Sequence, residues 1–228
     1  MQDRVVVVTG GFGTLGRAVA RRAFERGARV AVIDIGQKGA GQPLAPRTLE
    51  LGGVDLTDTA SARAAFARIE AEFGGVDVLL NIAGGFVWQK VAGGDLSAWD
   101  RMFAINLRSA VSACMAAIPL LEKSKSGAIV NVGAQAAAKA GAGMGAYAAA
   151  KAGIAKLTES LAEELKGKVT VNAVLPSIID TPANRADMPD ADFAQWVRPE
   201  EIADAMLFLA AKQSRAITGA LLPVTGGL

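Results

Sequence analysis

One stretch predicts the fold of this chain: Val5-Val6-Val7-Val8-Thr9-Gly10-Gly11-Phe12-Gly13-Thr14-Leu15-Gly16. The valine run predicts a buried strand, and residues 14–27 predict a helix that ends at a glycine. Glycines at a strand-to-helix turn let the backbone approach a pyrophosphate, which then lies at the helix N-terminus. Taken alone, the same glycines could form a tight turn that binds no ligand.

The next apolar run supplies an acidic residue. Residues 29–34 predict a second strand that ends at Asp34, eighteen residues after Gly16. A carboxylate there accepts hydrogen bonds from the adenosine ribose diol of NAD and repels a 2′-phosphate. Arg17 is the nearest cation, and it leaves NADP(H) open as a second cofactor. The two signals together predict a dinucleotide site that prefers NAD(H).

Strand-like and helix-like segments alternate along the rest of the chain. The strands are expected at residues 5–9, 29–34, 49–55, 76–82, 128–133, 169–175 and 221–224, and the helices at 14–27, 58–73, 97–121, 144–166 and 199–212. Residues 35–48, rich in glycine and proline, are expected to form a loop. This alternation predicts an α/β fold in which helices cover both faces of a parallel sheet. No linker or repeat divides residues 1–228, so a single domain is expected.

Composition excludes several functions. The 228 residues include no histidine, so histidine acid–base chemistry and histidine metal ligands are excluded, and no metal site is expected. The single cysteine, Cys114, excludes an intrachain disulfide. A net charge of +2 gives no basic footprint for nucleic acid. No signal peptide is visible and no apolar stretch approaches the ~20 residues of a membrane span, so a cytoplasmic protein with no membrane partner is expected.

Tyr147 and Lys151 form the candidate acid–base pair. They lie one helical turn apart in Tyr147-Ala148-Ala149-Ala150-Lys151, so both side chains share a face of the predicted helix. A nearby ammonium favours the phenolate and is expected to lower the pKa of the tyrosine. Two such residues are more often ordinary surface residues, so the interpretation depends on the remaining motifs.

Taken together, these motifs resemble the short-chain dehydrogenase/reductase family over nearly the whole chain. The resemblance is carried by the turn at residues 9–16, Asp34, Asp55, Asn81-Ile82-Ala83-Gly84, Asn106, Tyr147, Lys151, Asn172-Ala173-Val174-Leu175-Pro176, Thr181 and Val224-Thr225-Gly226-Gly227. It implies a single NAD(P)-binding domain of Rossmann type, with a doubly wound parallel sheet. It also implies an oxidoreductase in which Tyr147 donates a proton and Lys151 holds the ribose and a positive field, while Asn106 holds a water in the proton path.

The resemblance assigns further residues to cofactor and substrate. Those implied to contact the cofactor are Gly10, Gly11, Phe12, Gly13, Thr14, Leu15, Gly16, Asp34, Asp55, Leu56, Asn81, Ala83, Gly84, Tyr147, Lys151, Pro176 and Thr181. Those expected to contact the substrate are Phe86, Ala134, Gln135, Tyr147 and Trp196. Other interpretations stay open: Asn106 could be a polar kink in a packed helix, Trp196 an apolar anchor of a substrate-covering loop, and Thr181 a helix cap.

Several positions depart from the family pattern. Ala134 stands where the family has a serine, Thr14 replaces a glycine, and the segment between Asp34 and Asp55 is short. One branch, the dihydropteridine reductases, is similar to the chain in these departures and in residues 180–196, although Asn106 follows the general family instead. A methyl group cannot donate to a substrate carbonyl, so Ala134 favours a conjugated ring such as quinonoid dihydropterin as substrate, unless Gln135 or Lys139 supplies the donor.

Three functions therefore remain in competition. The first is an NADH-dependent reductase of quinonoid dihydropterin or a similar heterocycle. The second is an NAD(H)-dependent oxidoreductase of a carbonyl or secondary alcohol, and the third is a dinucleotide-binding sensor or scaffold without catalysis. Small residues on the helices at 97–121 and 144–166 allow close helix approach, and the family resemblance implies a homodimer or homotetramer.

Overall fold

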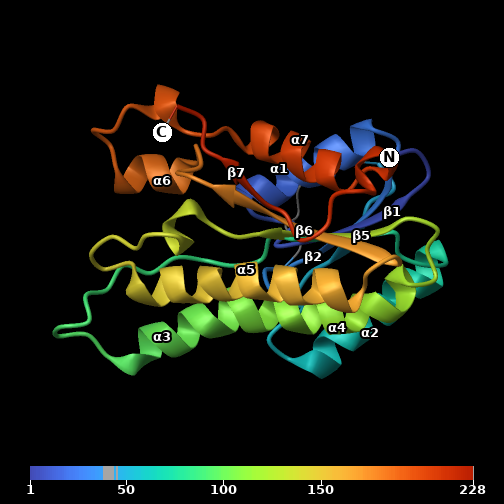
Figure 1. Ribbon diagram of the computed structural model, residues 1–228, viewed down its shortest axis with the longest axis horizontal. Helices are drawn as coiled ribbons and strands as arrows, with labels where there is room; N and C mark the ends of the chain where they lie inside the picture. The colour runs from blue at the N-terminus through green and yellow to red at the C-terminus, as the bar shows by residue number, and fades with distance from the viewer. Residues whose placement is uncertain (38–43, 45, 228) are drawn as a thin grey trace.

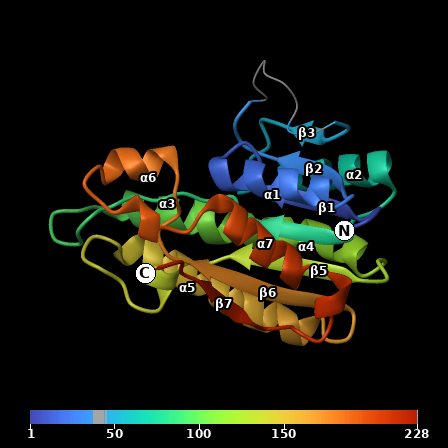
Figure 2. The same ribbon diagram turned by 90° about the horizontal axis from the view of Figure 1, so that it is seen from above.

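The computed structural model describes residues 1–37, 44 and 46–227. These residues form a seven-stranded parallel sheet in the order β3-β2-β1-β4-β5-β6-β7, with helices on both faces, as predicted (Figure 1 and Figure 2). The strands are β1 (Val5–Thr9), β2 (Arg29–Ile33), β3 (Leu49–Leu51), β4 (Val78–Asn81), β5 (Gly127–Val132), β6 (Val169–Pro176) and β7 (Leu221–Val224).

Two layers of helices enclose the sheet. The helices are α1 (Thr14–Glu25), α2 (Thr59–Phe73), α3 (Leu96–Met102), α4 (Ser109–Leu121), α5 (Gly145–Glu164), α6 (Pro182–Asp187) and α7 (Pro199–Leu209). Short helical segments cover Phe103–Arg108, Gln135–Ala137, Phe193–Gln195 and Lys212–Ser214. In Figure 1, α1 and α7 lie on one side of the sheet, and α2, α4 and α5 lie on the other.

The valines of β1 show how the sequence specifies these layers. Val5 and Val7 belong to a buried core shared with α2, α4 and α5, whereas Val6 and Val8 belong to the core shared with α1 and α7. All four side chains are at most 2% exposed. Because successive strand residues point to opposite faces, an unbroken apolar run is what a strand buried on both faces requires.

The strand order reverses beside β1, and this reversal locates the cleft. β1 pairs with β2 on one side and with β4 on the other. The connections that follow the two strands run in opposite directions, so a crevice opens at the carboxyl ends of β1 and β4. The glycine-rich turn follows β1 directly and therefore lies at this crevice.

The structure departs clearly from the predicted elements in three places. β3 ends at Leu51, earlier than expected, because Gly53 takes a φ of +73° and turns the chain. The predicted helix at 97–121 begins at Leu96 and contains a π-helical segment, Phe103–Arg108. Residues 180–196 contain the helix α6, where a loop was expected. Residues 38–43 and 45 of the expected loop at 35–48 lie outside the described residues.

The expectation that no apolar stretch approaches the length of a membrane span also needs correction. The continuous helix Leu96–Leu121 has 26 residues and a mean hydropathy of 1.5 in its most apolar window, half of which is buried inside the protein. It is long and apolar enough to span a membrane by length and composition alone. Ala113, Ala117 and Leu121 of this helix are fully buried in the core beside the sheet, which accounts for its apolar character.

Candidate active site

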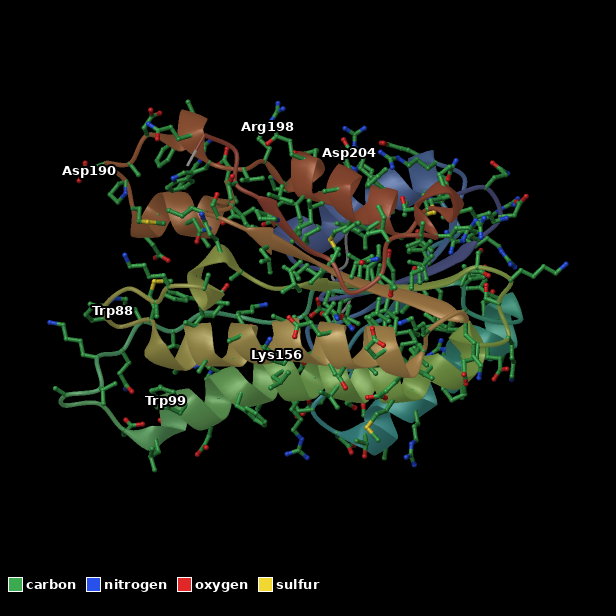
Figure 3. All side chains as sticks on the ribbon, viewed as in Figure 1. Trp88, Trp99, Lys156, Asp190, Arg198 and Asp204 are labelled. Carbon is green, nitrogen blue, oxygen red and sulfur yellow. The ribbon has the colours of Figure 1, made fainter. Side chains whose placement is uncertain are left out.

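A cleft of about 1880 Å³ opens at the carboxyl ends of the strands. We call the part lined by residues of the segments 10–16, 33–35 and 54–57 the glycine end, and the part lined by residues of the segments 84–88, 134–147 and 176–188 the loop end; not every residue of these segments lines the cleft. Trp88 and Trp99 lie on the same side of the molecule as Asp190, at the tip of the connection between β6 and α7 (Figure 3). The cleft has a strand-to-helix turn at one end and a wall made of longer connections at the other.

The glycine turn owes its sequence mainly to close backbone contacts. Gly10 has a φ of +65°, and a Cβ on it would lie 2.9 Å from the backbone of Ala83. A Cβ on Gly16 would overlap the carbonyl of Gly10, and one on Gly11 would overlap the side chain of Val32. At Gly13 the nearest atom to such a Cβ is 3.5 Å away, so this residue has open space. Six of the seven predicted turn residues line the cleft, namely Gly10, Phe12, Gly13, Thr14, Leu15 and Gly16, whereas Gly11 packs against β2.

Asp34 ties the end of β2 to the glycine turn. Its Oδ2 accepts from the Phe12 amide at 2.9 Å, and its Oδ1 accepts from the Gly36 amide at 2.8 Å. The Arg17 side chain donates to the Phe12 carbonyl at 2.9 Å, beside the Phe12 ring. A carboxylate held in this way at the wall of the cleft fits the ribose diol of a dinucleotide, and the open turn fits its pyrophosphate.

Asp55 and Leu56 line the same end of the cleft. The Oδ1 of Asp55 accepts from the amide and the hydroxyl of Thr57, at 2.8 and 2.7 Å. These bonds form a local turn and fix the carboxylate at the wall. Asp55 therefore closes a local turn, and its place on the cleft is also compatible with a cofactor contact.

Tyr147 and Lys151 lie together on the first two turns of α5, at the loop end. The Lys151 side chain is 5% exposed, and its Nζ donates to the Val132 carbonyl at 2.8 Å. The same Nζ lies 5.9 Å from the centre of the Tyr147 ring. The Phe86 ring meets the Tyr147 ring edge-on, with centroids 5.1 Å apart. The fold thus brings Tyr147 and Lys151 together, with the Phe86 ring packed against the Tyr147 ring.

Burial shifts both pKa values against the charged forms. Burial raises the pKa of Tyr147 to about 12 and lowers the pKa of Lys151 to about 8. The expectation that Lys151 lowers the pKa of the tyrosine is wrong for this structure, because desolvation of the phenolate outweighs the attraction of the cation. Tyr147 is therefore protonated at neutral pH, and most of the Lys151 side chains still carry their charge.

Asn106 lies in the π-helical segment and faces the same region. Its Nδ2 donates to the carbonyls of Gly85 and Met102 at 3.0 and 3.1 Å, and its Oδ1 accepts from the Gly85 amide at 3.2 Å. A Cβ on Gly84 would lie 2.5 Å from this Oδ1 and 3.6 Å from the Lys151 Nζ. Asn106 therefore anchors the irregular helix to the loop after β4, as the kinked-helix interpretation expects, and it also lines the cleft.

Most of the other predicted site residues also line the cleft. They are Ala83, Gly84, Phe86, Ala134, Gln135, Pro176 and Thr181, together with Lys139. Thr181 is also the N-cap of α6, since its Oγ1 accepts from the Asn184 amide at 3.1 Å. Residues that the sequence analysis did not assign join the loop end, notably Arg101, Met144 and Met188. No motif marks these three, because their place depends on loops that only the folded chain brings together.

Besides Gly11, two predicted residues do not line the cleft. Asn81 is buried, and its Nδ2 donates to Asn131 Oδ1 at 2.9 Å, so it links β4 to β5 inside the protein. Trp196 is 5% exposed and packs on Phe193, with ring centroids 4.8 Å apart. Its surroundings form a smaller hollow behind α6, outside the larger cleft, and the expected contact of Trp196 with the substrate stays a prediction.

Comparison with known proteins agrees with this geometry. A family model described as short chain dehydrogenase matches residues 4–192. The chain belongs to the short-chain dehydrogenase family. As a member of this family it is an oxidoreductase, and its cleft has the donors and the acceptor that a nicotinamide dinucleotide needs.

This short-chain dehydrogenase is similar over its whole length to dehydrogenases with different names. The chain is 32% identical to 2-(S)-hydroxypropyl-CoM dehydrogenase 3 of Xanthobacter autotrophicus, covering all of this chain and 97% of the relative. It is 34% identical to D-threitol dehydrogenase of Mycolicibacterium smegmatis, covering all of this chain and 93% of the relative. The structure of carveol dehydrogenase from Mycobacterium avium in complex with NAD matches with a TM-score of 0.87 and 27% identity, over 100% and 98% of the two chains. These proteins carry other dehydrogenase names, so the resemblance to dihydropteridine reductases stays a prediction.

Proposed function

We propose that this short-chain dehydrogenase is an NAD(H)-dependent oxidoreductase that interconverts a secondary alcohol and its carbonyl compound. The observation that carries the proposal is the buried Tyr147–Lys151 pair, which lies in the same cleft as the glycine turn and Asp34. A scaffold would need no such pair. The names of the relatives, a hydroxypropyl, a threitol and a carveol dehydrogenase, support an alcohol or carbonyl as substrate.

The proposed division of roles follows from the two pKa values. A bound nicotinamide dinucleotide would supply or accept the hydride. Tyr147, with a pKa of about 12, holds its proton at neutral pH and can donate it to an oxygen that gains negative charge. Lys151 keeps a positive charge beneath the tyrosine, which favours proton donation and steadies a ribose hydroxyl. Phe86 packs edge-on against the Tyr147 ring, and this contact would limit the access of water to that part of the ring.

Asp34 supports NAD(H) as the preferred cofactor. Its carboxylate lines the glycine end, and the Arg17 side chain at the same turn donates to the Phe12 carbonyl. A 2′-phosphate at this position would meet the negative charge of Asp34. NADP(H) remains the alternative cofactor, which the change of Asp34 described below would test.

A second candidate function rests on Ala134. This residue is 5% exposed at the wall of the cleft, where the family pattern has a serine, and its methyl group donates no hydrogen bond. Reduction of a quinonoid dihydropterin develops no discrete alkoxide and would need this donor less. For an alcohol or carbonyl substrate, Gln135 or Lys139 would supply the donor instead, since both line the same wall.

The remaining expectations become parts of the same proposal. We propose that residues 1–228 act as one cofactor-binding domain in the cytoplasm and act on a small molecule. We also propose a homodimer or homotetramer formed through α4 and α5. Phe103 and Met115 are each 55% exposed along the helix Leu96–Leu121, and covering them would favour association.

The test is a panel of secondary alcohols with NAD⁺, and of ketones and quinonoid dihydropterin with NADH, run beside Tyr147→Phe. We expect turnover of an alcohol or ketone that falls about 10²–10⁴-fold in the variant, with NADH binding retained. Turnover of dihydropterin alone would support the second candidate. NADH binding without any turnover would support a non-catalytic sensor or scaffold. Activity that is equal in Tyr147→Phe would contradict the proposed mechanism.

A further inference from the structure

The segment that connects β6 to α7, residues 177–198, leaves the sheet and returns to it at one point. Ile179 and Val197 form an isolated parallel bridge, the Asp180 amide donates to the Val197 carbonyl at 2.8 Å, and the Val197 amide donates to the Ile178 carbonyl at 3.0 Å. We call this contact between residues 178–180 and Val197 the neck. Residues 181–196 form a closed loop beyond it, which we call the excursion. Their position over the cleft depends on contacts outside the sheet ladder, because these residues pair with no strand.

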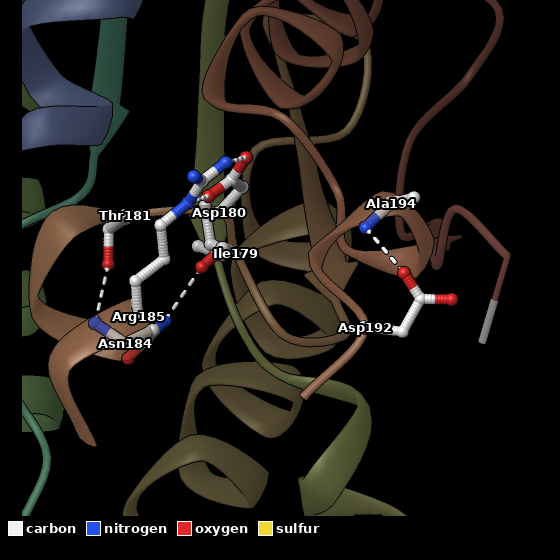
Figure 4. Close-up of polar contacts among 7 residues, drawn as sticks. All are labelled: Ile179, Asp180, Thr181, Asn184, Arg185, Asp192 and Ala194. Carbon is white, nitrogen blue, oxygen red and sulfur yellow. Dashed lines mark hydrogen bonds and ion pairs between the residues drawn. The ribbon is translucent and has the colours of Figure 1, made fainter. Parts of the chain in front are cut away.

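The helix α6 is the part of this excursion that faces the cleft. Ala183, Asn184, Asp187 and Met188 line the loop end. The helix has six residues, which is too few to be stable by itself. The Asn184 side chain donates to the Ile179 carbonyl at 2.8 Å, and the Asn184 amide donates to Thr181 Oγ1 (Figure 4). These bonds fix only the first turn.

Arg185 joins α6 to Asp180 at the neck and to Phe193 on the segment that returns to the sheet. Its Nε and Nη2 donate to the two carboxylate oxygens of Asp180 at 2.6 and 2.8 Å, which forms a bidentate pair at the neck (Figure 4). The central carbon of the same guanidinium lies 4.7 Å from the centre of the Phe193 ring. Phe193 belongs to the segment that returns to the sheet. A planar guanidinium can make both contacts at once, and a lysine ammonium cannot.

The Phe193 ring offers the Arg185 guanidinium a surface that is held in place by its neighbours. Phe193 packs on the buried Trp196. The Oδ1 of Asp192 accepts from the Ala194 amide at 3.1 Å (Figure 4), and the Gly227 amide near the C-terminus donates to the Gln195 carbonyl at 3.2 Å. Phe193 is thus held by the protein body, and the guanidinium of Arg185 transmits that restraint to α6.

We propose that Arg185 is a positioning residue, which keeps α6 against the substrate end of the cleft by bridging Asp180 and Phe193. Its side chain points away from the cleft into the smaller hollow behind α6, so it acts through the helix and does not touch the substrate. This inference rests on the proposed function for its kinetic consequences. It explains why Trp196 is buried: the tryptophan supports the surface on which Arg185 is stacked.

The kinetic test compares Arg185→Ala with a matched control, Arg26→Ala. Arg26 also forms an ion pair with an aspartate, 2.6 Å from Asp204, but that pair joins α1 to α7 (Figure 3 labels Asp204). In Arg185→Ala we expect the KM for the organic substrate to rise about tenfold, because displaced wall residues cost substrate positioning. The KM for NADH should stay within about twofold in both variants.

Arg185→Lys separates charge from geometry. It retains the cation but loses the bidentate fork and the flat stacking surface, so we expect a KM between those of the wild type and Arg185→Ala. A purely structural role would lower the fraction of active enzyme, which reduces kcat and leaves KM unchanged. That result, or the same KM change in Arg26→Ala, would overturn the proposal.

A measurement without turnover distinguishes failure of this inference from failure of the proposed function. Hydrogen–deuterium exchange of the wild type and of Arg185→Ala would follow the amides of α6 and, as an internal reference, those of α7. We expect faster exchange in α6 alone. If the wild type oxidises no alcohol and reduces no carbonyl, the proposed function fails while this experiment still applies. Equal exchange in the two proteins would refute the positioning role of Arg185.

Discussion

The two ends of the cleft are built by different means. The glycine end comes from one contiguous turn and the following strand, and its shape is imposed by backbone contacts at Gly10 and Gly16. The loop end is assembled from segments far apart in the sequence, which are joined by side-chain contacts such as that of Phe86 with Tyr147. The comparison teaches that backbone contacts restrict the side chains at Gly10 and Gly16 of the first end, whereas we expect side chains of the second end to be replaceable while the fold persists.

The largest effect is expected from Gly16→Ala. A Cβ at this position would overlap the Gly10 carbonyl, so α1 would have to move away from β1. We expect the free energy of unfolding to fall by about 3 kcal/mol or more, and the Tm to fall by roughly 6–12 °C. Thermal unfolding followed by circular dichroism would measure both.

Gly13→Ala is the matched control for this change. Gly13 lies in the same turn at a negative φ of −75°, and its added Cβ would have no neighbour closer than 3.5 Å. Its Tm should change by less than about 2 °C, in keeping with an unstrained site. If the two variants lost equal stability, the claim that backbone contacts specify the glycine end would be wrong.

The next largest effect is expected from Lys151→Met at the loop end, which should raise stability and lower activity. Burial lowers the pKa of Lys151 to about 8, which at neutral pH is worth about 3 kcal/mol of destabilisation relative to an uncharged side chain. Lys151→Met removes this cost but leaves the Val132 carbonyl without a donor, a loss of about 1 kcal/mol. We expect the Tm at pH 7 to rise by roughly 4–8 °C while turnover falls about 10²-fold or more.

The pH dependence checks the cause of that gain. Above pH 8 the folded wild type releases the Lys151 proton, whereas the unfolded chain retains it until about pH 10.4. The unfolded state then binds more protons, so wild-type stability rises with pH in this window and the advantage of Lys151→Met shrinks. Chemical unfolding at pH 7 and pH 9.5 would measure it, and an advantage independent of pH would show that desolvation of Lys151 is not the cause.

A smaller and more selective effect is expected from Asp34→Asn. The substitution retains one acceptor for the Phe12 amide and removes the negative charge, so we expect the KM for NADPH to fall about tenfold relative to that for NADH. Steady-state kinetics with both cofactors would measure the ratio. Asp58→Asn is the control, since Asp58 caps α2 through the Ala60 and Ser61 amides and does not line the cleft. An unchanged ratio in Asp34→Asn would remove the argument for NAD(H).

The smallest effect is expected from Ala134→Ser. The new hydroxyl would reach the cleft wall and could donate to a developing alkoxide, so ketone reduction should gain up to about tenfold in kcat/KM. Reduction of a quinonoid dihydropterin should not change. A gain restricted to ketones would support the alcohol and carbonyl function. No gain with any ketone would indicate that Gln135 or Lys139 already supplies the donor.

The sequence predicted the glycine end well because its determinants are local. A valine run, the glycine turn and Asp34 lie within thirty residues, and each has one physical reason for its place in the structure. It predicted the loop end less well. The direction of the Tyr147 pKa depended on burial, Trp196 turned out to support the back of α6, and Asn81 proved to be a link between strands. None of these outcomes follows from spacing along the chain.

The sequence by itself therefore determined the parallel α/β fold, the turn at residues 10–16 and the placement of Tyr147 and Lys151 on one helical face. Periodicity and backbone sterics act over a few residues, so they can be read in the order of the amino acids. Only the tertiary structure decided which loops wall the cleft, how deeply the Tyr147–Lys151 pair is buried and what Arg185 holds in place. Desolvation and side-chain packing depend on neighbours from distant segments, and those neighbours exist only once the chain has folded.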